Sequence, residues 1–258
     1  CPYLAVADTV VGENTCDGKK KAWETFGRFV DDLYVMDMPQ MKTTAGRALL
    51  RAEYKRFLEK VETLSGKTID VAALRRGITL SNAKRSALHR LARLRTADPA
   101  PISGLDALLA NQVAFYDDVE RFTASVNTIC DELETRIEQG IGVAPAGAPR
   151  ILVTGCPMAV PNWKVPTAIE ATGAVIVGEE SCVGERGTQT LVDGSGETID
   201  ELIDALVDRY LTIDCAIFTP NDSRLEHIQR LVAERKVDGV IQYGLLFCTP
   251  YLAEEGPF

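Results

Sequence analysis

"RILVTGCP", residues 150–157, is a short apolar run that ends in glycine, cysteine and proline. It predicts a buried strand, because it is too short for a helix and closes with turn residues. Helix-like and strand-like segments alternate after it, with helices at 162–173, 198–211 and 221–236 and strands at 174–182, 215–220 and 238–248. This alternation predicts an α/β domain over 150–258, built on a parallel sheet that helices cover on both faces.

The residues before 150 fall into two parts. Residues 4–14 and 33–39 read as strands around a helix at 19–30, which predicts that 1–45 belong to a further α/β domain. Residues 46–140 form a helical segment, with two helices that separate near "SGKT" at 65–68 and a third helical stretch at 105–139. The Gly-, Pro- and Ala-rich residues 140–149 are the best candidate for a linker.

Composition excludes some classes of protein. The 258 residues carry a net charge of −9, which argues against nonspecific nucleic-acid binding, since that binding needs clustered cations. No apolar run of about 18 residues suggests a membrane span, and no export signal is visible. Seven cysteines without an export signal favour a reducing compartment, so we expect a cytoplasmic protein whose thiols bind metal or do chemistry.

The cysteines divide by their place in the predicted sheet. Cys156, Cys182 and Cys248 lie at the ends of predicted strands, and the carboxyl ends of parallel strands share one edge, where ligands bind. We therefore expect these three thiols to converge, either as free buried thiols or as ligands of zinc or of an iron–sulfur cluster. Cys215 begins its predicted strand and should face the opposite edge, whereas Cys130 lies on the apolar stripe of a helix. We expect both to be spectators, small buried hydrophobic residues that bind no metal.

Other candidate ligands are weaker. The sequence holds no CxxC pair and no histidine at ligand spacing, which weakens a zinc-finger interpretation. His89 and His227 both fall on predicted helices, and we expect them at the surface. Hence any metal centre in this chain should depend on its cysteines.

A further thiol stands in "ENTCDGKKKAWE", residues 13–24. Cys16 follows a predicted strand and precedes a helix that opens with Lys19, Lys20 and Lys21. A disulfide, a nucleophile, a metal ligand and a buried spectator are all compatible with this position. A helix N-terminus and nearby lysines stabilise a thiolate. The lysines oppose the helix dipole, so an anionic group beside them would compensate; the alternative is a solvated run of charge.

Several motifs, taken in order, resemble one family. They are "VVGENTCDGKKKAWE", "ADPAPISG", "RILVTGCP", "EESC", "TPN" and "DGVIQYGLLFC". In this order they resemble the double-cubane cluster proteins. These are a branch of the superfamily of 2-hydroxyacyl-CoA dehydratases and benzoyl-CoA reductases, which is also called the 2-hydroxyglutaryl-CoA dehydratase D-component family. "TCDGKKK" is the most specific of these motifs, and the resemblance runs over essentially the whole chain.

The resemblance implies a fold and an activity. It implies two Rossmann-like parallel-sheet domains that face a cluster-binding cleft, with the helical segment between them. It also implies an oxygen-sensitive, anaerobic iron–sulfur oxidoreductase that passes low-potential single electrons to small molecules. A separate ATP-hydrolysing iron–sulfur reductase would supply those electrons, and a homo- or heterodimer is expected. Relative to the family, this chain looks truncated at both ends.

The resemblance further implies a set of ligands. A double cubane, two bridged four-iron cubanes, would be held by Cys1, Cys16, Cys156, Cys182 and Cys248, with a sixth cysteine outside this chain. Lys19, Lys20, Lys21 and Gly155 would lie beside the cluster and tune its charge. No catalytic residue is assigned.

Two alternatives stay open. The first is a subunit of a 2-hydroxyacyl-CoA dehydratase or benzoyl-CoA reductase, which acts on an acyl-CoA and holds a single four-iron cubane with three cysteines. The second is a non-catalytic, metal-stabilised scaffold. The metal content of the protein separates all three interpretations.

Overall fold

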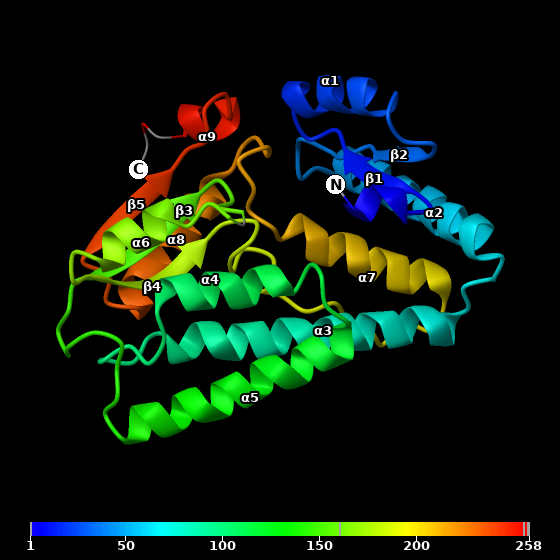
Figure 1. Cartoon of the computed structure of the whole chain (residues 1–258). Helices are drawn as coiled ribbons and strands as arrows, with labels where there is room; N and C mark the ends of the chain where they lie inside the picture. The colour runs from blue at the N-terminus through cyan, green and yellow to red at the C-terminus, as the bar shows by residue number, and fades with distance from the viewer. Residues whose placement is uncertain (1, 160, 255, 257–258) are drawn as a thin grey trace. The chain divides into compact units, whose positions relative to one another are not determined.

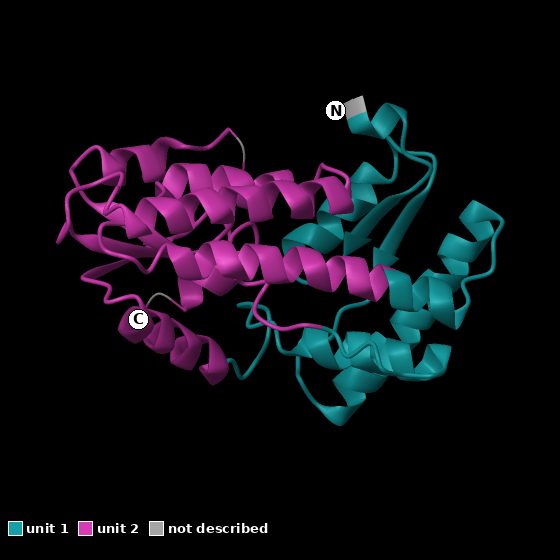
Figure 2. Ribbon diagram, turned by 90° about the horizontal axis from the view of Figure 1, so that it is seen from below, with its two compact units in different colours: residues 1–76, 192–221 teal, residues 77–191, 222–258 magenta. Residues whose placement is uncertain are grey.

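The computed structural model describes residues 2–159, 161–254 and 256, and it is a mixed α/β structure with two small parallel sheets (Figure 1). This confirms the expected α/β class with two parallel sheets. The chain divides into two compact units, residues 1–76 with 192–221 and residues 77–191 with 222–258 (Figure 2). Compact units are not the same as independently folding domains, so the predicted boundaries at 1–45, 46–140 and 150–258, and the cleft between domains, stay predictions.

The first unit holds a two-stranded parallel sheet. A short 3-10 helix, Pro2–Ala5, precedes strand β1 (Val10–Glu13), and helix α1 (Asp17–Phe26) leads to strand β2 (Leu33–Met36). Val10 pairs with Leu33 in parallel register. A parallel pair needs a crossover connection, and α1 provides it.

Two long helices complete this unit. Helix α2 (Thr44–Ser65) packs on α7 (Ile199–Leu211) through the buried side chains of Leu50, Ile203 and Val207. Burying such side chains is the main contribution to stability here, at about 1.5–3 kcal/mol each. The predicted start of α7 is confirmed, because Thr198 and Glu201 form a reciprocal capping box.

The second unit is built on three parallel strands in the order β4-β3-β5. They are β3 (Arg150–Gly155), β4 (Val175–Glu180) and β5 (Gly239–Tyr243). Leu152 of β3 packs against Ile228 and Leu231, whereas Val153 of the same strand packs against Leu108. Successive strand residues point to opposite faces, so helices cover both faces of this sheet, as predicted.

The helices of the second unit frame the sheet. Helix α8 (Asp222–Glu234) lies on one face, and α4 (Gly104–Val113) and α6 (Lys164–Glu170) lie on the other (Figure 1). Helices α3 (Val71–Leu94) and α5 (Val119–Glu138) share a separate apolar core, and α9 (Thr249–Ala253) follows β5. The boundary between the two units falls within α3. No helix in the described part of the chain is long and apolar enough to cross a bilayer.

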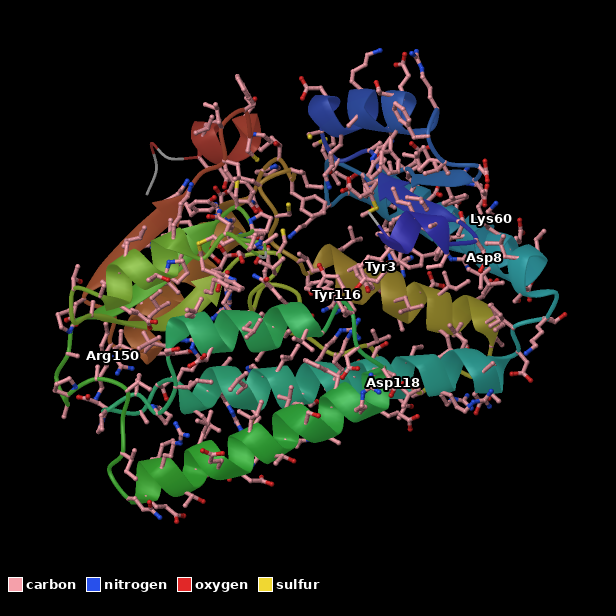
Figure 3. The ribbon with its side chains drawn as sticks, in the orientation of Figure 1. Tyr3, Asp8, Lys60, Tyr116, Asp118 and Arg150 are labelled. Atoms are coloured by element: carbon pink, nitrogen blue, oxygen red, sulfur yellow. The ribbon has the colours of Figure 1, made fainter. Side chains whose placement is uncertain are left out.

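Arg150 fixes the amino end of the central strand. Its buried guanidinium donates to the backbone carbonyls of Arg235, Thr96 and Ala97, at 2.8, 2.9 and 3.0 Å (Figure 3). These bonds tie the start of β3 to the segment after α3. The opposite end of β3, where Cys156 follows, is the candidate site.

Four sequence-based expectations about local structure are wrong. The strand expected at 4–14 covers only Val10–Glu13, and a 3-10 helix occupies Pro2–Ala5. Residues 215–220 form turns rather than a strand, and they belong to the first unit. Their apolarity has another cause, since Ala216 and Phe218 are buried. The helical stretch at 105–139 is two helices, separated by residues 114–118. The strand near 238–248 is only five residues long and half-buried.

Candidate functional site

The carboxyl edge of the three-stranded sheet brings three cysteine-bearing segments together. Cys156 directly follows β3, Cys182 follows β4, and Cys248 caps the start of α9 after β5. The strands end in register, because Thr154 pairs with Glu180 and Gly155 pairs with Tyr243. All three cysteines therefore emerge on one edge, the arrangement expected of a ligand site in a parallel sheet.

Gly155 allows the tight end of the central strand. Its φ is +113°, and a Cβ at this position would lie 2.3 Å from the carbonyl oxygen of Tyr243. The next residue, Cys156, then donates its N–H to the same carbonyl at 2.8 Å. A glycine is needed here to bring the Cys156 backbone against β5. A direct effect of Gly155 on a cluster stays a prediction.

Cys156 and Cys248 are close neighbours. Cys156 is 1% exposed, and the half-buried Cys248 lies near enough to its thiol to influence its pKa. Burial raises the pKa of the Cys156 thiol to about 11, and the neighbouring Cys248 adds to this, while an N–H from Leu245 opposes it. Without a metal this thiol holds its proton at neutral pH, and metal binding would release it.

Arg186 links the third cysteine to this pair. Its Nη1 donates to the Cys182 sulfur at 3.3 Å, and its Nη2 donates to the Gly155 carbonyl at 3.1 Å. The guanidinium also contacts the Tyr251 hydroxyl, in the helix that Cys248 caps. Arg186 was missed by the sequence interpretation. The only signal was a basic residue in the loop "SCVGER", and its partners lie far away in sequence.

The remaining predicted ligands lie elsewhere. Cys16 is half-buried before α1 in the first unit, so its convergence with the other thiols stays a prediction. Cys1 lies outside the described residues. The exposed lysines of α1 are partly paired within the chain, Lys19 with Glu13 and Lys21 with Glu24 at 2.7 Å. These pairs weaken the positive patch that Lys19, Lys20 and Lys21 were expected to form.

The expected spectator residues have mixed outcomes. Cys130 is fully buried in the core of α3 and α5, as its place on an apolar stripe indicated. Cys215 is half-buried rather than buried, and it cannot face the opposite edge of the sheet, because no strand forms at 215–220. His89 is exposed, but His227 is buried on α8, where Arg230 contacts its Nδ1 at 2.8 Å. The expectation that both histidines lie at the surface is therefore wrong for His227.

The chemistry of Cys156, Cys182 and Cys248 limits which metal groups they could bind. Among the described residues, no three Cys, His, Asp or Glu side chains are grouped closely enough to hold one metal ion. Soft thiolate ligands also select iron–sulfur clusters or zinc over magnesium and calcium. Cys156, Cys182 and Cys248 thus have suitable chemistry for corners of a cluster.

Thiol reactivity tests this geometry without any metal. We expect iodoacetamide at pH 7.5 to modify the exposed Cys182 well before Cys156 in the native, metal-free protein. A pKa of about 11 leaves Cys156 about a hundredfold fewer thiolates than an ordinary cysteine, and burial slows it further. Peptide mapping by mass spectrometry measures both rates. In urea the two should become similar; equal rates in the native protein would contradict the placement.

A buried carboxyl next to the site gives a pH-dependent stability. Glu179 of β4 is 2% exposed, accepts a hydrogen bond from Ser181 at 2.9 Å, and has its pKa raised to about 7, mainly by burial. The folded state then binds a proton that the unfolded state, with a pKa near 4.5, gives up. The stability associated with this proton is complete below pH 4.5 and is lost as the pH rises through 7.

Glu179→Gln should remove this dependence. From pH 4.5 to pH 8 we expect the free energy of unfolding of the wild type to fall by roughly 3 kcal/mol relative to that of the variant. Gln can still accept the Ser181 bond, so the comparison isolates the charge. Urea unfolding across this pH range measures the difference between the two proteins. A difference that does not change with pH would show that Glu179 titrates normally.

Comparisons with known proteins concern the chain as a whole. The family model for the D-component of 2-hydroxyglutaryl-CoA dehydratase matches residues 2–258. The chain is 38% identical over 256 residues to the putative dehydratase subunit YjiM of Escherichia coli (strain K12), covering 98% of this chain and 65% of that protein. It is 25% identical over 241 residues to the (R)-phenyllactyl-CoA dehydratase beta subunit of Clostridium sporogenes, covering 92% and 62%.

A more distant relative belongs to a reductase. One of the benzoyl-CoA reductase subunits of Thauera aromatica is 22% identical over 219 residues, covering 84% of this chain and 55% of that protein. The chain thus spans less than two thirds of the length of each of these three relatives.

Proposed function

Because this chain belongs to the family of the 2-hydroxyglutaryl-CoA dehydratase D-component, we propose that it is the cluster-binding part of an iron–sulfur enzyme for low-potential, one-electron reduction of small molecules. The resemblance to the dehydratase and benzoyl-CoA reductase superfamily is confirmed. The observation that carries the proposal is the set of three cysteines that follow three neighbouring parallel strands at one edge.

The cysteines at the sheet edge would supply three of the cluster ligands. Cys156, Cys182 and Cys248 would each bind an iron, and Cys16 and Cys1 would complete a double cubane with a cysteine from outside this chain. The bound cluster would supply single electrons at low potential. The protein's own part is to exclude water around the buried Cys156 and to direct the Leu245 N–H at its sulfur. Amide donors of this kind stabilise added negative charge.

The electrons would come from another protein. The sequence contains no P-loop, so a separate ATP-dependent iron–sulfur reductase would supply them. The exposed lysines of α1 would attract an acidic partner or an anionic substrate such as an acyl-CoA, less strongly where Lys19 is already paired with Glu13. We also propose a homo- or heterodimer in the cytoplasm, where thiols stay reduced.

A second candidate function shares the site. The chain resembles an (R)-phenyllactyl-CoA dehydratase subunit and a benzoyl-CoA reductase subunit. These similarities favour a role in radical dehydration or reduction of an acyl-CoA, with a single cubane. The third interpretation, a metal-stabilised scaffold, shares the family but performs no redox chemistry.

Metal content separates the three. Iron and acid-labile sulfide are measured per chain on protein purified without oxygen. About eight irons support the double cubane, and about four support the single cubane, in which case acyl-CoA turnover is assayed next. Zinc alone, or no metal after anaerobic reconstitution with ferrous iron and sulfide, would overturn both enzyme proposals and leave the scaffold.

A further inference from the structure

We propose that Arg186 is a positioning residue that holds the three cysteine-bearing segments at one edge of the sheet. Its contacts reach the ends of β3 and β4 and a side chain of α9, the helix that begins just after Cys248. Nη2 donates to the carbonyl of Gly155 at 3.1 Å, next to Cys156, and to the carbonyl of Glu180 at 3.0 Å, at the end of β4. Where these segments hold a cluster, the inference rests on the proposed function.

Two further contacts of Arg186 reach a second cysteine and the helix that follows the third. Nη1 donates to the sulfur of Cys182 at 3.3 Å and contacts the hydroxyl of Tyr251. Tyr251 lies in α9, whose first residue follows Cys248. The backbone carbonyl of Tyr251 accepts a hydrogen bond from the side-chain amide of Gln242, in β5, at 3.1 Å. A single guanidinium thus connects the ends of β3 and β4, one thiol directly, and the helix that sets the position of another.

The guanidinium is itself held rigidly. Arg186 is 4% exposed, and the fully buried carboxylate of Glu180 binds it through both oxygens, one at 2.9 Å from Nη2. Tyr251 stacks its ring against Arg186 and Arg224, with guanidinium carbons 5.3 and 4.9 Å from the ring centroid. A planar, bidentate, buried guanidinium keeps its five donors in fixed directions. Lysine at this position would keep the charge and lose those directions.

Stability alone does not explain this arrangement. Buried ion pairs can often be replaced by apolar residues without loss of stability. A buried pair that also contacts the cysteine-bearing segments is therefore a candidate for a role besides stability. The second buried pair in the same unit provides the comparison. Arg235 is 5% exposed and binds Glu185 and the carbonyl of Val177, and none of its contacts among the described residues reaches a cysteine.

The first test uses Arg186→Lys, with Arg235→Lys as the matched control. Both variants keep a buried positive charge and lose a planar fork. After anaerobic reconstitution with ferrous iron and sulfide, we expect Arg186→Lys to lose iron to a chelator about tenfold faster than the wild type, with an altered electron paramagnetic resonance spectrum. Arg235→Lys should keep the wild-type rate and spectrum. Tyr251→Phe, which removes only the hydroxyl contact, should lie between them.

The second test needs no metal. Diamide should join the thiols of Cys156 and Cys248 in the metal-free wild type, since they are already close neighbours. Loosening α9 in Arg186→Lys or Tyr251→Phe should slow this disulfide severalfold, and Arg235→Lys should not. Mass spectrometry of the cross-linked peptides gives the rates.

The outcomes are distinct. If Arg186→Lys matches the wild type in both tests, or if Arg235→Lys fails equally, the positioning role is wrong. If the wild type takes up no iron, the proposed function fails, and the diamide rates alone decide whether Arg186 positions the segments.

Discussion

Cys156→Ser is expected to abolish the proposed iron–sulfur cluster, with iron, sulfide and visible absorbance falling at least about tenfold per chain. Cys156 follows the central strand and is 1% exposed, so a thiol from solvent cannot take its place. Serine is nearly the same size but offers a hard oxygen that stays protonated, whereas iron–sulfur clusters are held by thiolates. Anaerobic reconstitution followed by iron and sulfide analysis measures the loss.

Cys130→Ser is the matched control. Cys130 is equally buried, but it lies in the core between α3 and α5, with its sulfur 4.0 Å from the carbonyl of Ala87. Serine there should cost modest stability and leave the iron content unchanged. The opposite pattern, a bleached Cys130→Ser and a loaded Cys156→Ser, would show that the sheet edge is not the cluster site.

The strand-end cysteines could be predicted because their signals are local. "RILVTGCP" and "AVIVGEESC" are short apolar runs that close with turn residues, and the geometry of parallel sheets then places Cys156 and Cys182 on one edge. "CAIFTP", 215–220, carries the same apolar signal without forming a strand. An apolar run predicts that a segment is buried, but a short buried turn and a short buried strand have the same apolar composition.

Arg186 could not be predicted because its role depends on distant partners. Its bonds reach Gly155 and Tyr251, which lie on other segments of the chain. A charged residue in a loop ordinarily indicates a solvated surface, and nothing in the neighbouring sequence shows that this one is 4% exposed. The same limit applies to Arg95, Glu185 and Arg235, whose charges meet only in the folded sheet.

Glu185→Gln is expected to destabilise the protein by about 3–5 kcal/mol, because it leaves two buried cations without their carboxylate. Glu185 is 2% exposed and accepts bonds from Arg95 at 3.1 Å and Arg235 at 2.9 Å. Burial opposes its ionisation, but the two guanidiniums, Arg235 first, hold the pKa of Glu185 below its usual value. Such a loss is a large part of the 5–15 kcal/mol that typically separates folded from unfolded protein.

The control is a solvent-exposed ion pair on the surface of α5. Glu132→Gln breaks an exposed pair with Arg136 one turn along α5, and it should change stability by less than about 0.5 kcal/mol. Urea unfolding of the metal-free proteins at pH 7 compares the two variants with the wild type. Because the pKa of Glu185 is lowered on folding, its contribution is lost as the pH falls through that value, so Glu185→Gln and wild type should converge in acid. If Glu185→Gln lowers the free energy of unfolding no more than Glu132→Gln does, the two guanidiniums must find other partners. The ion pairs of Glu185 would then contribute little to the stability of the sheet that carries the cysteines.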